Sequence, residues 1–270
     1  MTEKKDWTVG EWIYKPEEMF SVKDKVTIVT GAASGIGRAI ALGFDALGAR
    51  VVLADINEEG IEEAAKECRG DILKTKLDVT DEKSIQAAIK KTMNKYGRID
   101  VSFNIPGINI RKPALELTYE EYDKVLQINQ VGVFKCAREV GKIMCDQKKG
   151  SMINMASLLA EGVLPFQVAY ASTKGAIRQM TGVLAIEWAP YVRVNAIGPC
   201  YIETPLVKQV MTNTKWYESM RKLNIQKRFG KPEEIVGTAV FLASDASSLY
   251  TGALLLPDGG MCNFFGWVET

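Results

Sequence analysis

Three side chains near the middle of the sequence, Ser157, Tyr170 and Lys174, have the types and spacing needed for acid–base chemistry on a hydroxyl or carbonyl group. Tyr170 and Lys174 stand at positions i and i+4, so a helix would direct both into one pocket. A free tyrosine titrates near about 10, and a neighbouring cation favours the phenolate and lowers that pKa. Ser157 would hydrogen-bond the same substrate oxygen. A Tyr-x-x-x-Lys pair alone is more often a surface feature of a helix, so its meaning depends on the rest of the chain.

The chain of 270 residues contains no histidine. Ser-His-Asp and Cys-His catalysis, histidine-containing zinc sites and imidazole proton shuttles are therefore excluded. Any catalytic acid or base must be a tyrosine, lysine, cysteine or carboxylate. The cysteines are widely spaced and form no C-x-x-C pair, which predicts neither a disulfide framework nor a metal site and favours a reducing, cytoplasmic location. They are Cys68, Cys136, Cys145, Cys200 and Cys262.

The overall composition is that of a soluble globular protein, with 47% hydrophobic and 25% charged residues. Lys plus Arg number 34 and Asp plus Glu 33, so the net charge of +1 gives no general attraction to nucleic acid or anionic lipid. No apolar run reaches the roughly 18 residues of a spanning helix, and residues 1–15 are too charged for a signal peptide. We therefore expect a small-molecule substrate and no nucleic-acid or membrane partner.

A glycine-rich segment, TGAASGIG at residues 30–37, lies between the first predicted strand and a helical run at residues 38–44. Glycines allow a tight turn there and let backbone N–H groups approach a pyrophosphate. The helix N-terminus then directs its unpaired donors and positive dipole end at the phosphates. A Walker-type site is excluded, because no Gly-Lys-Ser/Thr ends the segment. The predicted phosphate contacts are Gly31, Ser34, Gly35, Ile36 and Gly37.

An acidic residue, Asp55, ends the second predicted strand about 20 residues after the glycine-rich segment. In that position its carboxylate would accept hydrogen bonds from both adenosine ribose hydroxyls and repel a 2′-phosphate. The sequence therefore predicts NAD(H) rather than NADP(H) as cofactor. The alternative is that Asp55 merely caps or precedes the helix that begins near Asn57.

The elements that must position these side chains alternate from Lys25 onward, with short β-branched runs between longer helical patterns. One such pattern, at residues 85–96, ends near Gly97, a plausible C-cap. Apolar strands alternating with helices predict an α/β fold, a mostly parallel sheet covered by helices on both faces. The predicted strands are 26–29, 51–54, 72–77, 99–103, 151–155, 192–196 and 253–256.

No linker divides the chain, so we expect a single domain over residues 23–260. Residues 199–230 form a long excursion after the sixth strand, where a substrate-covering segment would lie in an open α/β sheet. Residues 1–22 form an N-terminal extension, and residues 261–270 an apolar tail. The extension is too aromatic for an ordinary disordered segment, since it holds Trp7, Trp12, Tyr14 and Phe20.

Taken together, the sequence resembles the short-chain dehydrogenase/reductase superfamily over about residues 22–260. The resemblance implies a doubly wound Rossmann fold with a seven-stranded, mostly parallel sheet. It rests on many short matches in the right order, which is far more specific than any single motif. They are Thr30-Gly31-x-x-x-Gly35-x-Gly37, Asp78-Val79, Asn104-x-x-Gly107, Asn129, Ser157, Tyr170-x-x-x-Lys174, Arg193-Val194-Asn195, Pro199 and Asp258-Gly259-Gly260.

The resemblance also implies roles for these positions. Tyr170 would be the acid/base, and Lys174 would hold the nicotinamide ribose and lower the Tyr170 pKa. Ser157 would orient the substrate oxygen, and Asn129 would fix a water in a proton relay through Lys174. The remaining cofactor contacts would be Asp78 and Val79 at the adenine, Asn104 and Gly107 at the adenosine ribose, and Pro199, Ile202 and Thr204 over the nicotinamide.

Two departures from the family pattern bear on cofactor binding. Ile105 and Pro106 replace the usual Asn and Ala, and Pro106 removes an N–H donor and restrains its neighbour. Cys200 stands where the family commonly has Gly. It is either a redox-sensitive thiol or, the reading we favour, a small apolar filler.

At a finer level the segment 107–113 and the loop from Tyr201 resemble sugar and sugar-acid dehydrogenases of the gluconate 5-dehydrogenase and 2-deoxygluconate 3-dehydrogenase kind. Arg111 and Lys112 would give a cationic rim suited to a carboxylate, or would be solvated loop charges. We predict reversible oxidation of a secondary hydroxyl on a sugar acid or polyol. An inactive NAD-binding regulator or scaffold, or a dehydrogenase for another carbonyl class, is the alternative.

The family resemblance implies a homotetramer. Its contacts would involve the helix that begins near Tyr119, the helix around Ala176 and the last strand. The tail at 261–270 would reach the edge of a partner subunit's active site.

Overall fold

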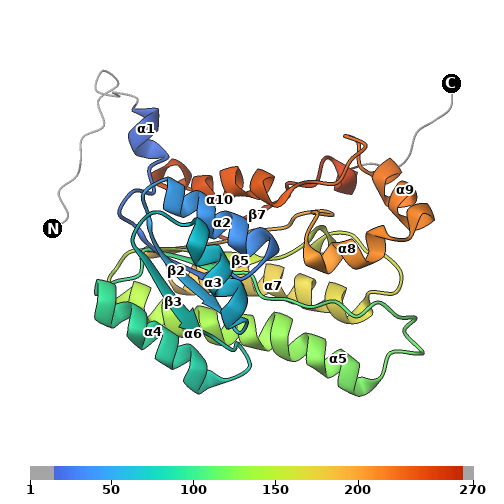
Figure 1. The fold of residues 1–270 in the computed structure, drawn as a ribbon, viewed down its shortest axis with the longest axis horizontal. Helices are drawn as coiled ribbons and strands as arrows, with labels where there is room; N and C mark the ends of the chain where they lie inside the picture. Colours follow the sequence, from blue (N-terminus) through green and yellow to red (C-terminus); the bar gives the residue numbers. More distant parts are fainter. Residues whose placement is uncertain (1–14, 264–270) are drawn as a thin grey trace.

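The computed structural model describes residues 15–263 and arranges them as a seven-stranded sheet between two layers of helices (Figure 1). The strand order is β3-β2-β1-β4-β5-β6-β7, and every neighbouring pair is parallel. This confirms the predicted doubly wound α/β fold. The strands are β1 (Val26–Thr30), β2 (Arg50–Asp55), β3 (Ile72–Lys76), β4 (Val101–Asn104), β5 (Gly150–Met155), β6 (Val192–Ile197) and β7 (Leu254–Leu255).

Each face of the sheet is covered by its own set of helices, because the central strands are apolar on both faces. Buried side chains of α2, α3 and α10 pack on one face, and those of α4, α6 and α7 pack on the other. α4 ends at Gly97, whose φ of 70° confirms the predicted left-handed C-cap. The helices are α1 (Pro16–Met19), α2 (Gly35–Ala46), α3 (Glu58–Glu67), α4 (Glu82–Tyr96), α5 (Tyr119–Leu126), α6 (Val133–Asp146), α7 (Val168–Glu187), α8 (Pro205–Met211), α9 (Thr214–Leu223) and α10 (Val236–Ala243).

Three strands are shorter than the sequence predicts, and in two of them side chains take the place of strand partners. β3 ends at Lys76 rather than at residue 77. β4 starts at Val101 rather than at residue 99, since the amide of Gln147 pairs with both the N–H and the carbonyl of Ile99. β7 starts one residue later than predicted, since the N–H of Ala253 donates to the side chain of Asn195. Side-chain competition of this kind leaves no period-2 signal in the sequence.

The excursion at residues 199–230 forms α8 and α9, joined to the strand that precedes them by an aromatic cluster. Tyr201, which follows β6, stacks on Phe229 with ring centroids 5.1 Å apart. Trp216 and Tyr217 of α9 meet these two rings edge-on. These aromatic contacts therefore hold α9 over the carboxyl edge of the sheet.

The two terminal segments are described only in part. Residues 1–14, with Trp7, Trp12 and Tyr14, and residues 264–270 lie outside the described residues. The ring of Phe20, which follows α1, lies 6.4 Å from that of Phe241 on α10. At the other end Met261–Asn263 form a short 3-10 turn. No helix within residues 15–263 is both long and apolar enough to cross a membrane.

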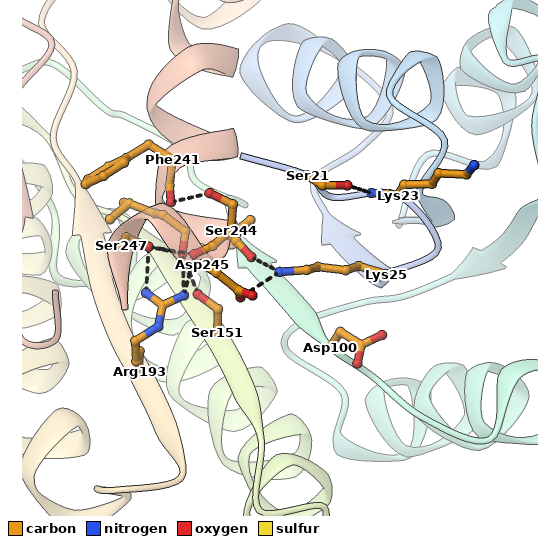
Figure 2. Close-up of polar contacts among 12 residues, drawn as sticks. Ser21, Lys23, Lys25, Asp100, Ser151, Arg193, Phe241, Ser244, Asp245 and Ser247 are labelled. Atoms are coloured by element: carbon orange, nitrogen blue, oxygen red, sulfur yellow. Dashed lines mark hydrogen bonds and ion pairs between the residues drawn. The ribbon is translucent and has the colours of Figure 1, made fainter. Parts of the chain in front are cut away.

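At the amino edge of the sheet, two cations cap the carboxyl end of α10 (Figure 2). The Arg193 guanidinium, from β6, donates to the carbonyls of Leu242 and Ser244 and to the hydroxyl of Ser247. Lys25, just before β1, donates to the carbonyl of Ala243 at 2.9 Å. The last carbonyls of a helix lack intrahelical partners and carry partial negative charge, so these contacts stabilise the junction between α10 and the sheet.

Candidate active site

A cavity of about 470 Å³ opens at the carboxyl edge of the sheet, next to the neighbouring strands β1 and β4. The strand order reverses here, because the chain continues from β1 toward β2 and from β4 toward β5, on opposite sides. Ligands bind at such switch points in open α/β sheets. Most of the predicted site residues line this one cavity, although they come from distant parts of the sequence. They are Gly31, Ser34, Gly35, Ile36, Gly37, Asp55, Asp78, Val79, Gly107, Ser157, Tyr170, Lys174, Pro199, Ile202 and Thr204.

The glycine-rich turn has a backbone that other residues would disrupt. Gly31 and Gly35 have φ values of 80° and 55°, which side chains rarely adopt. A Cβ at Gly37 would lie 2.0 Å from the Gly31 carbonyl oxygen. Ser34, exposed before α2, makes no side-chain cap to its first turn. The donors at the start of α2 therefore face the cavity without a side-chain acceptor, as anion binding requires.

Asp55 lies half-buried at the end of β2 and joins that strand to the glycine-rich turn. Its Oδ2 accepts the N–H of Ala33 at 3.0 Å, and its Oδ1 accepts the N–H of Asn57 at 2.9 Å. The cap of α3 is Asn57, whose side chain accepts the N–H of Gly60, so Asp55 is not the capping residue. A carboxylate offers about four acceptor positions, so Asp55 retains capacity for ligand hydroxyls.

Ser157, Tyr170 and Lys174 meet on one wall of the cavity. Ser157 follows β5 and is buried, while Tyr170 and Lys174 lie one turn apart on α7. The Lys174 ammonium donates to the carbonyl of Met155 at 2.7 Å and lies 5.4 Å from the centre of the Tyr170 ring. The predicted i, i+4 geometry is confirmed.

Burial dominates the electrostatics of this wall. It lowers the pKa of Lys174 to about 8, from the ordinary lysine value of 10.5. Burial also raises the pKa of Tyr170, and the Ser157 hydroxyl and the Arg111 charge both act in the opposite direction. The sequence predicted a Tyr170 pKa lowered by the neighbouring lysine and the cofactor, whereas burial makes the net shift upward, and it predicted no part for Arg111. The effect of Lys174 on the Tyr170 pKa stays a prediction.

Asn104 and Asn129 lie behind the cavity wall. The Asn129 amide pairs with the N–H and the carbonyl of Ile108, each at 2.8 Å, and so fixes the loop after β4. Asn129 lies in a π-helical turn, Gln127–Gly132, rather than in an ordinary helix. Asn104 donates to Asn154 on β5, while its buried Oδ1 has no partner. The water relay through Asn129 and the ribose contact of Asn104 remain predictions.

The residues that depart from the family pattern occupy the cavity wall. Ile105 packs on the core, and Pro106 lies beside the glycine-rich turn, with its nitrogen 3.2 Å from a Cβ built on Gly31. Burial raises the pKa of the Cys200 thiol to about 11, with the Asp258 carboxylate adding to the effect. Cys200 is therefore protonated and weakly nucleophilic at neutral pH, which favours the filler reading over the redox reading.

A second cavity of about 50 Å³ adjoins the wall formed by Ser157, Tyr170 and Lys174, and it includes Asn109 and Gln167, for which the sequence predicted no role. Arg111 lines it together with Asn109, Gln167 and Tyr201, and Ser157 and Tyr170 belong to both cavities. Lys112 does not line it and instead forms an ion pair with Glu121. The expected rim of two cations is therefore reduced to one. Only the position of Gln167, one helical turn before Tyr170, hinted at a role for it.

No metal site accompanies these cavities in the described part of the chain. Residues 15–263 contain no group of three or more cysteine, aspartate or glutamate side chains arranged to hold a metal ion. The polar groups available to a ligand are thus the hydroxyls, amides, cations and backbone donors described above.

Residues 31–262 match a family model described as Enoyl-(Acyl carrier protein) reductase. The chain is 42% identical over 242 residues to the NAD-dependent glycerol dehydrogenase of Listeria innocua, covering 89% of this chain and 95% of that one. The chain belongs to the short-chain dehydrogenase/reductase family. As a short-chain dehydrogenase/reductase it is an oxidoreductase enzyme.

Two further comparisons extend this family assignment. The chain is 33% identical over 248 residues to the 5-keto-D-gluconate 5-reductase of Escherichia coli K12, covering 90% of this chain and 98% of that one. The crystal structure of a putative gluconate dehydrogenase from Agrobacterium tumefaciens superposes with a TM-score of 0.88 at 32% identity, covering 92% and 99% of the two chains. Both relatives are covered along nearly their whole length, so the similarity extends over the segments that line the cavity as well as over the sheet.

Proposed function

We propose that this short-chain dehydrogenase/reductase uses NAD(H) to interconvert a secondary alcohol and a ketone on a sugar acid or polyol, with Tyr170 as general acid/base. One observation carries the proposal: Ser157, Tyr170 and Lys174 share a cavity with the glycine-rich turn and Asp55. A dinucleotide held by the turn and Asp55 would extend along this cavity to the wall formed by Ser157, Tyr170 and Lys174, the catalytic wall. NAD-dependent action on glycerol by one relative, and action on a keto sugar acid by another, support the same class.

The residues present fit a dinucleotide. The uncapped first turn of α2 offers donors to a pyrophosphate, and Asp55 retains acceptor positions for ribose hydroxyls. When bound, NAD(H) would supply hydride transfer between its nicotinamide ring and the reacting carbon of the alcohol or ketone. The loop that contains Pro199, Ile202 and Thr204 lines the cavity near the catalytic wall and would cover that ring.

The side chains of the catalytic wall transfer the proton of the substrate hydroxyl. In the oxidation direction the Tyr170 phenolate takes the proton of the substrate hydroxyl, and in reduction the phenol returns it. The Ser157 hydroxyl, within reach of the same oxygen, holds it in line with Tyr170. Lys174 supplies positive charge behind the ring and holds a ribose, because its ammonium is fixed by the Met155 carbonyl.

Asp55 supports NAD(H) as the cofactor. Its carboxylate at the end of β2 disfavours a 2′-phosphate, and the nearby cation Arg38 is engaged by Glu67. We expect wild-type kcat/KM to be higher with NAD than with NADP, and Asp55→Ala to reduce that preference about tenfold or more. Steady-state kinetics with both cofactors tests this, and a wild-type preference for NADP would overturn it.

Substrate class is tested by screening gluconate, 2-deoxygluconate, related sugar acids and neutral polyols with NAD. Turnover of steroids or fatty acyl thioesters alone would reject the sugar-acid and polyol assignment. The alternative, an NAD-binding regulator on the same fold, predicts cofactor binding without turnover of any of these compounds.

We also propose a cytoplasmic homotetramer, consistent with cysteines that are all free thiols. Large apolar side chains are exposed on the elements expected at the subunit contacts. They are Tyr119 on α5, Val183 and Ile186 on α7, and Leu249 before β7. Light scattering should give four times the chain mass, and deletion of residues 261–270 should alter assembly or activity. A monomer in solution would contradict the proposal.

A further inference from the structure

We infer that Arg111 and Asn109 form a recognition subsite for the 2-hydroxycarboxylate end of a sugar-acid substrate. The inference rests on the proposed function and sharpens it, since glycerol-like polyols and sugar acids both remain open there. The small cavity that adjoins Ser157 and Tyr170 would then select sugar acids over neutral polyols.

The first observation is an unpaired donor on a cation. The Nε of Arg111 is buried and has no hydrogen-bond partner, and no carboxylate within residues 15–263 forms an ion pair with this guanidinium. Its neighbour Lys112 is paired with Glu121. A buried polar group without a partner is unfavourable, and more so when it is charged. Arg111 therefore lacks a counter-ion, whereas the adjacent Lys112 has one.

The second observation is an unpaired acceptor beside it. Asn109 donates its Nδ2 to Gln167 at 2.6 Å, which turns its buried Oδ1 away from any partner. Gln167 is itself buried, so its side-chain oxygen, which accepts from the Asn109 amide, holds that amide in one orientation. The loop is held further by the N–H of Lys112, which donates to the carbonyl of Phe166 at 3.0 Å. Donor and acceptor are thus positioned before any ligand arrives.

The cavity between these groups limits what can bind. Its volume of about 50 Å³ accommodates a fragment of about three to five non-hydrogen atoms, the size of a carboxylate with its adjacent hydroxyl-bearing carbon. The rest of its wall includes the apolar side chains of Leu158, Leu159 and Leu164. Because Ser157 and Tyr170 border it, a fragment in this cavity belongs to the molecule whose hydroxyl reacts at Tyr170.

A carboxylate with an adjacent hydroxyl satisfies both unpaired groups. The carboxylate can receive two parallel N–H donors from the guanidinium, and the neighbouring hydroxyl can donate to Asn109 Oδ1. A neutral diol can make hydrogen bonds but leaves the half-buried charge of Arg111 without a counter-ion. Burial already lowers the pKa of Arg111, so the charged form gains most from an anionic ligand.

The test compares compounds that differ only at the end placed in this subsite. D-Gluconate and D-glucitol form such a pair, since a carboxylate in one replaces a CH2OH group in the other. We expect the ratio of kcat/KM for gluconate over glucitol to favour gluconate in the wild-type enzyme. Arg111→Gln should lower that ratio by about 30-fold or more, as expected for breaking a desolvated charge pair. Arg111→Lys should give an intermediate ratio, because the charge remains and the planar fork is lost.

The ratio is the readout because Arg111 also lowers the Tyr170 pKa, so its loss reduces kcat for both compounds. Lys112→Gln is the matched control: it removes the adjacent cation and should change the ratio by less than about threefold. An unchanged ratio in Arg111→Gln, or a wild-type preference for glucitol, would overturn the inference. Preferred oxidation of glucitol would leave the proposed function standing and would reject the subsite.

A binding measurement separates the two claims further. Calorimetric titration of D-gluconate into the NAD-loaded Tyr170→Phe variant should give a Kd that weakens about 30-fold or more on adding Arg111→Gln. Gluconate binding that does not respond to Arg111, or no gluconate binding at all, would contradict the subsite. Arg111-dependent binding without turnover in the wild type would uphold the subsite and reject the proposed reaction.

Discussion

Arg193 and Arg111 are two half-buried arginines at opposite edges of the sheet, and they differ in what surrounds the guanidinium. Burial lowers the pKa of both. Arg193 donates to carbonyls and a hydroxyl at the end of α10, as Figure 2 shows. Arg111 has a buried Nε without a partner. The amino edge of the sheet is thus completed by the protein's own polar groups, whereas the carboxyl edge leaves such groups for a ligand.

The partners of the guanidinium donors distinguish a structural from a functional cation in this enzyme. A cation whose terminal donors are directed at the protein's own carbonyls and hydroxyls contributes to the stability of the fold. One with unpaired donors, in a cavity bordered by reactive side chains, is available to a substrate. The contrast predicts that changes at the carboxyl edge affect turnover more than stability, and changes at the amino edge the reverse.

The largest expected effect is on turnover at the carboxyl edge. Tyr170→Phe removes the proton donor and acceptor while keeping the ring, so kcat should fall about 1000-fold. NAD affinity and the free energy of unfolding should stay within about 1 kcal/mol of wild type, because the Tyr170 hydroxyl forms no hydrogen bond to the backbone of residues 15–263. Steady-state rates, NAD titration and urea unfolding check these outcomes. Unchanged activity would require a different acid/base.

The next effect is on stability at the amino edge. Arg193→Met removes the donors that satisfy the last carbonyls of α10, and should lower the free energy of unfolding by about 3 kcal/mol. Among molecules that remain folded, kcat/KM should be unchanged. A loss of catalytic efficiency with normal stability would break the distinction between the two edges.

Lys174 links both properties through pH. Its folded-state pKa of about 8 lies below 10.5, so the cost of burying its charge is fully present below pH 8 and is lost as pH rises toward 10.5. Lys174→Met should therefore be inactive yet more stable than wild type by about 2 kcal/mol near neutral pH. This advantage should shrink at alkaline pH. Urea unfolding at several pH values measures it, and an advantage independent of pH would contradict the cause.

The smallest effect concerns the unpaired cation itself. Arg111→Met, matched to Arg193→Met, should leave the free energy of unfolding within about 1 kcal/mol of wild type or raise it slightly, because no protein hydrogen bond to Nε is lost. Thermal or urea unfolding of the two methionine variants side by side checks the contrast. Equal destabilisation by both would mean that Arg111 is a structural cation as well.

Local signals predicted the fold and much of the site. The glycine-rich turn, the C-cap at Gly97 and the spacing of Tyr170 and Lys174 each depend on residues close in the sequence, and the structure confirms their geometry. The absence of histidine had already directed attention to tyrosine and lysine. Such features are predictable because the backbone conformation or helical period alone determines them.

The remaining features depend on tertiary contacts that no local pattern encodes. Arg111 and Lys112 are adjacent and chemically alike in the sequence, yet only the fold shows that Lys112 pairs with Glu121 and that Arg111 does not. The placement of Asn104 behind the cavity wall likewise follows from its hydrogen bond to Asn154 on the neighbouring strand. Pairing of polar groups across the fold, rather than residue type, decides which of them a ligand can use.

The most direct test of the proposed reaction is to follow the hydride. D-Gluconate carrying deuterium at individual carbinol carbons would be incubated with the wild-type enzyme and NAD, and the NADH analysed by mass spectrometry. The proposed reaction predicts deuterium in NADH from one secondary carbinol carbon, with a ketone appearing at that carbon and none of this in Tyr170→Phe. Deuterium arriving from the primary carbon, or NADH formed with equal efficiency by Tyr170→Phe, would contradict it.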